Sequence, residues 1–228
     1  MARTVLITGG TGVLGKAVTR RFVEDGHRVA VTRRVAEEIE GLSDLTGNVT
    51  FVEADVTNEV SVRSAVEDIS GRLGPIEILA HLVGGWTGGE PVQQHSLDTW
   101  DRMLVLNLRS AFLCCRAVLP AMQRSGWGRI ILVSARAARS GRTGQAGYSV
   151  AKAGVAVLAE TIAEENRGSD VTANVVAPSV IDTPTNRDAM PGADPGIWVP
   201  PADLAASVAF LASEEAGQLR GAWLPVFG

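Results

Sequence analysis

A tyrosine and a lysine four residues apart are the side chains in this sequence best suited to acid–base chemistry. Tyr148 is the only tyrosine of the chain, and Lys152 follows it. On a helix, residues four apart share one face, so the two side chains would lie together. An ammonium group beside a phenol favours the phenolate and lowers the pKa of the tyrosine toward the range of a working general acid. The pair therefore predicts proton donation by Tyr148, tuned by Lys152.

A glycine-rich turn near the N-terminus predicts a nucleotide site. Gly10, Gly12 and Gly15 have the spacing G-x-G-x-x-G, after an apolar run and before a segment of helical period. Glycines permit a tight turn and let the backbone approach a pyrophosphate, and the N–H groups that begin the following helix attract its charge. The residues expected to contact a dinucleotide here are Gly9, Gly10, Thr11, Gly12, Val13, Leu14 and Gly15.

Two arginines bear on the choice between the nicotinamide cofactors. The second apolar run ends in Arg33 and Arg34, and no acidic residue follows before Glu37. An acid at this place usually bonds the ribose 2′-hydroxyl of NAD, whereas an arginine pairs with a 2′-phosphate. We therefore expect NADP(H) as the preferred cofactor. NAD(H) stays as the alternative, in which the two arginines form a solvated loop pair.

The elements that must position these residues alternate between short apolar runs and longer segments of helical period. The runs are rich in Val, Ile and Leu on both faces, which is typical of parallel strands covered by helices on both sides. The alternation predicts an α/β fold, a doubly wound parallel sheet of Rossmann type, in a single domain over residues 1–228. The expected strands are Thr4–Thr8, Arg28–Thr32, Val49–Ala54, Ile76–Leu82, Arg129–Val133, Val171–Val176 and Ala222–Val226. The expected helices are Leu14–Glu24, Glu59–Arg72, Leu97–Gln123, Tyr148–Glu165 and Pro201–Ala212.

One long segment lacks a clear period. Residues 182–201 hold five of the ten prolines of the chain. Long loops in compact domains often close over a binding site, so we expect an irregular lid here that screens the reaction from water.

Composition and charge exclude several classes of partner. The chain is 46% hydrophobic and 20% charged, which fits a folded globular protein, and its net charge of −4 argues against nucleic acid as a partner. We expect no metal site, because Cys114 and Cys115 are adjacent, and we expect both to be buried thiols. The sequence has no run of 18 apolar residues, so no membrane span is predicted. We expect a cytoplasmic protein that acts on a small molecule.

The chain resembles the short-chain dehydrogenase/reductase family over essentially its whole length. Thr8–Gly15 is similar to the glycine motif of that family, and Tyr148 with Lys152 is similar to its catalytic pair. Asn107 matches its helix asparagine. The resemblance implies catalysis by Tyr148, Lys152 and Asn107, with Lys152 also bonding the nicotinamide ribose and Asn107 helping to hold a water chain for the proton.

The same resemblance extends the expected cofactor site. An Asp-Val pair after the third strand matches the family's adenine contact, and the segment after the sixth strand matches the one that closes over the nicotinamide. The further cofactor contacts that the resemblance implies are Asp55, Val56, Val83, Gly84, Tyr148, Lys152, Pro178, Val180 and Thr183.

Members of the family usually form dimers or tetramers through two long helices, which here are Leu97–Gln123 and Tyr148–Glu165. The resemblance therefore implies a homodimer or homotetramer. In the second helix, small residues recur on one face and suit close packing between helices; these are Ala151, Val155, Ala159 and Ala163.

Two segments depart from the family pattern. The family has Asn-Asn-Ala-Gly after its fourth strand, and this chain has His81-Leu82-Val83-Gly84. We interpret His81 as a structural histidine at a strand end, with a direct catalytic role as the alternative. The usual Pro-Gly is Pro178-Ser179 here, which is a mild change.

The larger departure concerns a serine. The family places its catalytic serine thirteen residues before the tyrosine, and that position is Ala135 in this chain. Ser134 is one residue earlier, and neighbouring side chains of a strand point to opposite faces, so Ser134 should not replace the missing hydroxyl. Loss of a donor of this kind costs about 3–4 kcal/mol in a well-studied enzyme. Reduction of ordinary ketones should therefore be handicapped.

Three explanations of Ala135 stay open. The enzyme reduces a substrate that needs little polarising; or the fold is a catalytically silent NADP(H)-binding sensor or scaffold; or a carbonyl reductase or alcohol dehydrogenase carries an inactivating Ser-to-Ala change. Local likeness to dihydropteridine reductases favours the first, because they also carry alanine here. Segments 84–89, 134–138 and 182–198 are similar to theirs.

Quinonoid dihydropterin, the substrate of that branch, is an electron-poor imine. We therefore expect an NADP(H)-dependent short-chain reductase that transfers hydride to an activated C=N or C=O of a small planar substrate. Besides Ala135, the residues expected at the substrate are Trp86, as a flat surface for a planar ring, and Trp198 in the lid. Three arginines follow Ala135 and either face solvent or attract an anionic group of the substrate; these are Arg136, Arg139 and Arg142.

Overall fold

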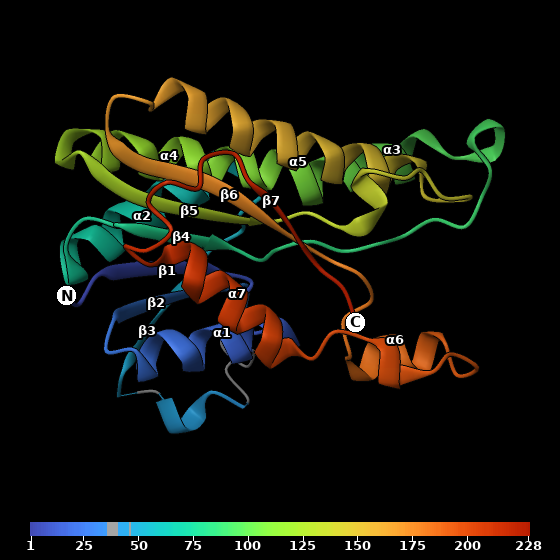
Figure 1. The fold of residues 1–228 in the computed structure, drawn as a ribbon, viewed down its shortest axis with the longest axis horizontal. Coiled ribbons are helices and arrows are strands. Elements are labelled where there is room, and N and C mark those ends of the chain that lie inside the picture. Colours follow the sequence, from blue (N-terminus) through green and yellow to red (C-terminus); the bar gives the residue numbers. More distant parts are fainter. Residues whose placement is uncertain (36–40, 46) are drawn as a thin grey trace.

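Seven parallel strands form one twisted sheet at the centre of the molecule (Figure 1). The computed structural model describes residues 1–35, 41–45 and 47–228. The strand order is β3-β2-β1-β4-β5-β6-β7. Strands are added on one side of β1 up to β3 and on its other side from β4 onward, as in a doubly wound fold. The strands are β1 Thr4–Thr8, β2 Arg28–Arg33, β3 Val49–Glu53, β4 Ile78–His81, β5 Trp127–Val133, β6 Asp170–Pro178 and β7 Trp223–Val226. The expected Rossmann-type sheet is confirmed.

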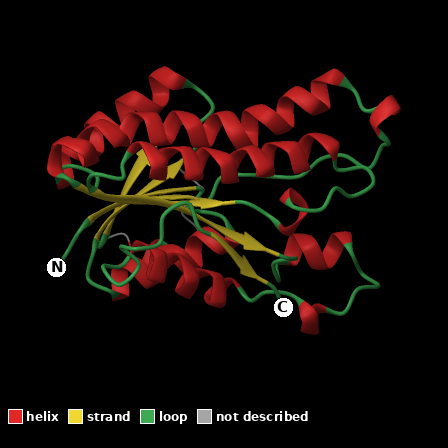
Figure 2. Ribbon diagram, turned by 45° about the horizontal axis from the view of Figure 1, so that its top comes forward, coloured by secondary structure: helices red, strands yellow, loops and turns green. Residues whose placement is uncertain are grey.

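Helices cover both faces of this sheet (Figure 2). One layer holds α2, α4 and α5, and the other holds α1 and α7, which pack against each other. The helices are α1 Val13–Glu24, α2 Glu59–Leu73, α3 Leu97–Leu104, α4 Ser110–Ser125, α5 Ala146–Glu165, α6 Pro184–Ala189 and α7 Pro201–Ala212. Beyond one end of the sheet lie α6 and the loop between β4 and α3 (Figure 1).

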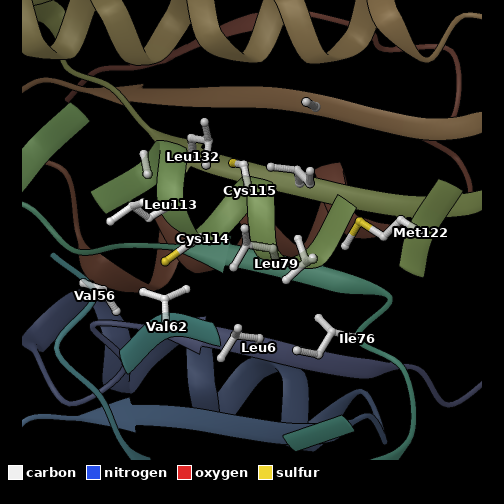
Figure 3. Close-up of a cluster of buried hydrophobic side chains, with 14 of the residues drawn as sticks. Leu6, Val56, Val62, Ile76, Leu79, Leu113, Cys114, Cys115, Met122 and Leu132 are labelled. Carbon is white, nitrogen blue, oxygen red and sulfur yellow. The ribbon is translucent and has the colours of Figure 1, made fainter. Parts of the chain in front are cut away.

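A core of aliphatic side chains fills the space between the sheet and the layer of α2, α4 and α5 (Figure 3). Cys114 and Cys115 lie in it, near Leu79 and Leu132, and both are free thiols at 1% exposure. Burial raises the pKa of the Cys114 thiol to about 12, so it stays protonated at neutral pH. The prediction of two buried thiols is confirmed.

The predicted helix Leu97–Gln123 is interrupted. Residues Val105–Arg109 form a π-turn between α3 and α4, in which backbone bonds join residues five apart. The lid also differs from the prediction, because it is not irregular throughout. It contains α6, which Thr183 begins by accepting a hydrogen bond from the N–H of Asn186. Pro184 suits the first turn of that helix, where no N–H is needed.

The small-residue face of α5 points inward, which corrects its expected role in assembly. Ala151 and Val155 are buried at 0% and 1%, and Ala159 and Ala163 are buried at 1% and 3%. Their small size lets the helix lie close to its own sheet, with which α5 packs along β5 and β6. They are therefore unavailable to a second copy of the chain.

One stretch, Leu97–Ser125, is long and apolar enough to cross a membrane by length and composition. It is formed by α3, the π-turn and α4, and 44% of its most apolar window is buried inside the structure. Core helices meet the same criterion, so the stretch is weak evidence for a membrane span.

Candidate active site

The carboxyl ends of β1, β4, β5 and β6 meet at one edge of the sheet, because these strands are parallel neighbours. The glycine turn follows β1, residues 82–89 follow β4, and Ser134 with Ala135 follows β5. Open parallel sheets bind ligands at this edge, beside the point where strand order reverses. The topology therefore brings together the segments that the sequence singled out.

The glycine turn is too tightly packed for side chains at Gly9, Gly10 and Gly15, where an added β-carbon would lie 3.0 Å or less from its nearest neighbour. Gly9 has a φ of +73°, and a β-carbon added to it would lie 3.0 Å from the backbone nitrogen of Val83. A β-carbon on Gly15 would lie 2.1 Å from the carbonyl oxygen of Gly9. The N-cap of α1 is Gly12, which has no side chain to accept from the first N–H groups of the helix. This exposed helix start fits a pyrophosphate group.

The predicted adenosine end of the site lies where β2 and β3 finish. Arg33 is half-buried and pairs in register with Glu53 of β3, and Arg34 is exposed. The Asp55 carboxylate accepts hydrogen bonds from the hydroxyl of Thr57 at 2.7 Å and from its N–H at 2.9 Å. Mainly the hydroxyl bond, and to a lesser degree the nearby positive charges, lower the pKa of Asp55. Glu37, the next acid after the arginines, lies outside the described residues.

Lys152 is buried beneath the tyrosine. Its side chain is 4% exposed, its Nζ lies 5.9 Å from the centre of the Tyr148 ring, and it donates to the carbonyl oxygen of Val133 at 2.8 Å. Burial lowers the pKa of Lys152 to about 8. Burial also raises the pKa of Tyr148 to about 12, so the expected lowering by the lysine is wrong for this structure. The phenol is protonated at neutral pH, as a proton donor must be.

Asn107 is held rigidly inside the π-turn, at 0% exposure. Its Oδ1 accepts from the N–H of Gly85 at 3.1 Å, and its Nδ2 donates to the carbonyl oxygens of Gly85 at 3.0 Å and Met103 at 3.1 Å. A β-carbon on Gly84 would lie 2.8 Å from Oδ1 of Asn107 and 2.9 Å from Nζ of Lys152. The structure thus brings Asn107 and Lys152 together under a glycine. Gly85 is a partner that the sequence did not reveal, because the π-turn leaves no periodic signal.

Ala135 leaves the site without the hydroxyl that the family pattern places there. This residue is 7% exposed and lies two residues after the end of β5. Ser134 points away, and its Oγ donates to the backbone carbonyl of Lys152 at 2.8 Å inside the core. The expectation that Ser134 does not replace the missing hydroxyl is confirmed, and this serine instead ties β5 to α5.

A family model described as short chain dehydrogenase matches residues 3–193. This chain belongs to the short-chain dehydrogenase family. The 3-oxoacyl-[acyl-carrier-protein] reductase MabA of Mycobacterium tuberculosis (strain ATCC 25618 / H37Rv) is 35% identical over 236 residues, which cover 100% of this chain and 92% of MabA. The acetoacetyl-CoA reductase of Allochromatium vinosum is 33% identical, covering 100% of this chain and 98% of that enzyme.

A solved structure titled ElxO with NADP bound superimposes with a TM-score of 0.92 at 25% identity, covering 99% of this chain and 97% of ElxO. By family this short-chain dehydrogenase is an oxidoreductase. None of these three proteins is named a dihydropteridine reductase, so the local likeness to that branch stays a prediction.

In this short-chain dehydrogenase, the two tryptophans expected at the substrate differ in exposure. Trp86 is 54% exposed, on a loop that is fixed near the start of α5 because the N–H of Gly89 donates to the carbonyl of Gly144 at 2.9 Å. Trp198 is 6% exposed. Trp86 therefore offers an open flat surface, whereas the Trp198 indole packs inside the structure.

The lid is tied to the segment after β6. The N–H of Asp182 donates to the carbonyl oxygen of Val199 at 2.9 Å, and the N–H of Val199 donates to the carbonyl oxygen of Val180 at 2.8 Å. These two bonds join the beginning of the lid to its end. Arg187 forms an ion pair with Asp182 at 2.7 Å. The hydrogen bond from this arginine is the main cause that lowers the pKa of the Asp182 carboxyl group. Thr183, expected at the nicotinamide, uses its hydroxyl to cap α6.

Two of the three loop arginines pack on the C-terminal strand. The guanidinium of Arg136 lies 5.2 Å from the ring centre of Phe227, and that of Arg139 lies 4.1 Å from the ring centre of Trp223. These are cation–π contacts that join the loop after β5 to β7 and its end. Arg136, Arg139 and Arg142 are all exposed, so the expected solvated face is confirmed.

Proposed function

We propose that this chain is an NADPH-dependent reductase that delivers hydride to an activated C=O or C=N carbon, with Tyr148 as the proton donor. The proposal depends mainly on the close approach of Lys152 and Asn107 at Gly84. A β-carbon on that glycine would lie within 3 Å of the polar atoms of both side chains, and Lys152 lies beside Tyr148. A fold that only bound a nucleotide would need the glycine turn, and a lysine for the ribose, but not all three of these polar side chains together.

NADP(H) fits the residues present. The crowded backbone at Gly9 and Gly15 and the side-chain-free start of α1 suit a pyrophosphate. Arg33 ends β2 and Arg34 follows it, where a 2′-phosphate needs cationic partners. NADP is also the ligand named for ElxO, which shares the fold over 99% of this chain. By the family resemblance, Asp55 and Val56 flank the adenine, and Val83, Pro178 and Val180 lie along the nicotinamide.

The bound nicotinamide supplies the hydride. Tyr148 gives its phenolic proton to the oxygen or nitrogen of the substrate as the carbon accepts that hydride. Because the pKa of Tyr148 is about 12, the phenol holds its proton at neutral pH until the substrate becomes basic. Lys152, with a pKa of about 8, is mostly charged at pH 7 and stabilises the phenolate that remains. Asn107 is held too firmly by Gly85 to move, so it serves as a fixed polar group beside Lys152.

Ala135 sets the class of substrate. Without a hydroxyl donor at this position, the transition state for reduction of an unactivated ketone loses about 3–4 kcal/mol of stabilisation. This loss lowers the rate by about 10²–10³-fold. A substrate whose acceptor carbon is already electron-poor does not need that donor. We infer that quinonoid dihydropterin, a planar imine that could lie on the open face of Trp86, belongs to this class.

A second candidate class is the 3-oxoacyl thioesters. It is favoured by MabA and the acetoacetyl-CoA reductase, which are 35% and 33% identical to this chain and carry those substrates in their names. Oxidation of NADPH, followed at its absorbance band, tests both classes together with a simple ketone, and NADH is run in parallel. Turnover of an activated acceptor with NADPH supports the proposal. Binding of NADPH without turnover of any acceptor would favour a silent sensor.

We also propose assembly into a dimer or tetramer through the two expected helices, but through their outer faces instead of the buried small-residue face of α5. Phe112 of α4 is 45% exposed, and Val150 and Val157 of α5 are 49% and 58% exposed. These apolar side chains lie on the outer faces of the two helices that the family uses for assembly. Light scattering at several protein concentrations measures the size. A cytoplasmic location stays a prediction.

A further inference from the structure

A chain of buried hydrogen-bonding groups joins the strand before the glycine turn to the π-turn. Thr8 ends β1, and its Oγ1 lies 2.7 Å from Nδ1 of His81, which ends β4. Nε2 of His81 lies 3.2 Å from Oγ of Ser110, the first residue of α4. Ser110 Oγ in turn donates to the carbonyl oxygen of Leu106 at 2.6 Å. Each of the three side chains is at most 2% exposed, so the chain runs through the core.

The direction of each hydrogen bond follows from the last one. Ser110 has one hydroxyl hydrogen, which it donates to Leu106, so its oxygen must accept from His81. Nε2 of His81 therefore carries the ring hydrogen, and Nδ1 accepts from the hydroxyl of Thr8. Burial lowers the pKa of His81 to about 3, which keeps the ring in this neutral form.

Ser110 replaces a backbone bond that the π-turn removes. In an α-helix the N–H of Ser110 would bond the carbonyl of Leu106, four residues earlier. In this structure that N–H donates to the carbonyl of Val105, five residues earlier. The side-chain hydroxyl of Ser110 takes the carbonyl of Leu106 instead. The π-turn register thus uses a hydroxyl whose orientation His81 fixes.

We propose that His81 is a positioning residue: through Ser110 it holds the π-turn in the register that places the amide of Asn107 against Gly85. The inference rests on the proposed function, because Asn107 is assigned to the reaction there. The same turn also contacts the adenosine end of the site, since Arg109 donates to the carbonyl of Thr57 at 2.9 Å. His81 therefore acts on a segment that joins both ends of the site, without touching a substrate itself.

A phenylalanine at position 81 tests this role, because it keeps a buried ring of similar size but removes both ring nitrogens. His81→Phe should lower kcat by ~10- to ~100-fold, as expected for misplacement of a catalytic group, and should raise the KM for NADPH by a much smaller factor. His81→Gln restores a donor that reaches Ser110 and should recover most of the lost kcat. The proposal is overturned if His81→Gln is as slow as His81→Phe and both variants raise the KM for NADPH by the same factor by which they lower kcat.

A second pair of variants tests the route through Ser110. Ser110→Ala should reduce kcat as much as His81→Phe, and the double variant should be no slower than either, because both remove the same support. Additive losses would contradict the route. The control is Asn166→Ala, which breaks another buried amide network, at the far end of α5 and fourteen residues from Lys152, or about 21 Å along the helix. It should leave kcat unchanged.

Hydrogen exchange separates this proposal from the proposed function. In His81→Phe and Ser110→Ala, amide protons in residues 104–112 should exchange faster than in the unsubstituted protein, with NADPH present or absent, while the rest of α4 stays protected. This result is independent of turnover, so it stands even if no substrate is reduced. Unchanged protection of residues 104–112 in both variants would overturn the inference.

Discussion

Lys152 carries a cost in stability that its removal should reveal. The lysine is 4% exposed, and burial lowers its pKa from 10.5 to about 8. In the folded state it therefore holds its proton less tightly than in the unfolded state. Below pH 8 the whole penalty applies, and stability rises as the pH increases from about 8 to 10.5, because the unfolded chain then binds more protons. At pH 7 the two pKa values correspond to a penalty of about 3 kcal/mol.

Lys152→Met removes this penalty but leaves the carbonyl of Val133 without its partner, which costs about 1 kcal/mol. We expect the variant to be more stable by about 2 kcal/mol at pH 7, and the difference to disappear near pH 10. Urea unfolding, followed by the fluorescence of the five tryptophans, measures both proteins at each pH. A less stable variant at pH 7, or a difference that does not change with pH, would refute the reasoning. The variant should also lose its reductase activity.

Three further substitutions test the site. Tyr148→Phe should reduce turnover by ~10²-fold or more with NADPH binding intact, because the proton donor is lost; normal turnover in a steady-state assay would contradict that role. Gly84→Ala places a β-carbon 2.9 Å from Nζ of Lys152 and should lower kcat by at least ~10-fold, whereas Gly71→Ala, which meets nothing within 4 Å, is the control. Arg33→Ala should weaken NADPH binding by about 1.5–3 kcal/mol in a fluorescence titration and leave NADH unaffected; equal losses for both would show that the arginine does not bind a 2′-phosphate.

Local chemistry explains why much of the site could be predicted from the sequence. Gly15 must be glycine because a β-carbon there would collide with the carbonyl oxygen of Gly9. Tyr148 lies four residues before Lys152, which is one turn on any helix. Both constraints act over a few residues, so they leave a readable spacing. The parallel strands were readable for the same reason, because burial on both faces leaves continuous apolar runs.

Other features depend on packing between distant segments, and the sequence left no signal for them. The π-turn uses the hydroxyl of Ser110, and His81 orients this hydroxyl from the end of β4, 29 residues earlier in the chain. The pKa of Tyr148 is set by burial rather than by its neighbour on the helix, so spacing pointed in the wrong direction. The small face of α5 was assigned to a partner subunit because periodicity shows that a face is apolar and does not show what covers it.

The most direct test of the account is to restore serine at position 135 and compare two substrates. With NADPH as cofactor, kcat/KM is measured for Ala135→Ser and the unsubstituted protein, on quinonoid dihydropterin and on a simple ketone. We expect the serine to raise ketone reduction by about 10²–10³ and to change reduction of the activated acceptor far less. The account is contradicted if the unsubstituted protein reduces both substrates equally well, or if neither protein turns over either substrate.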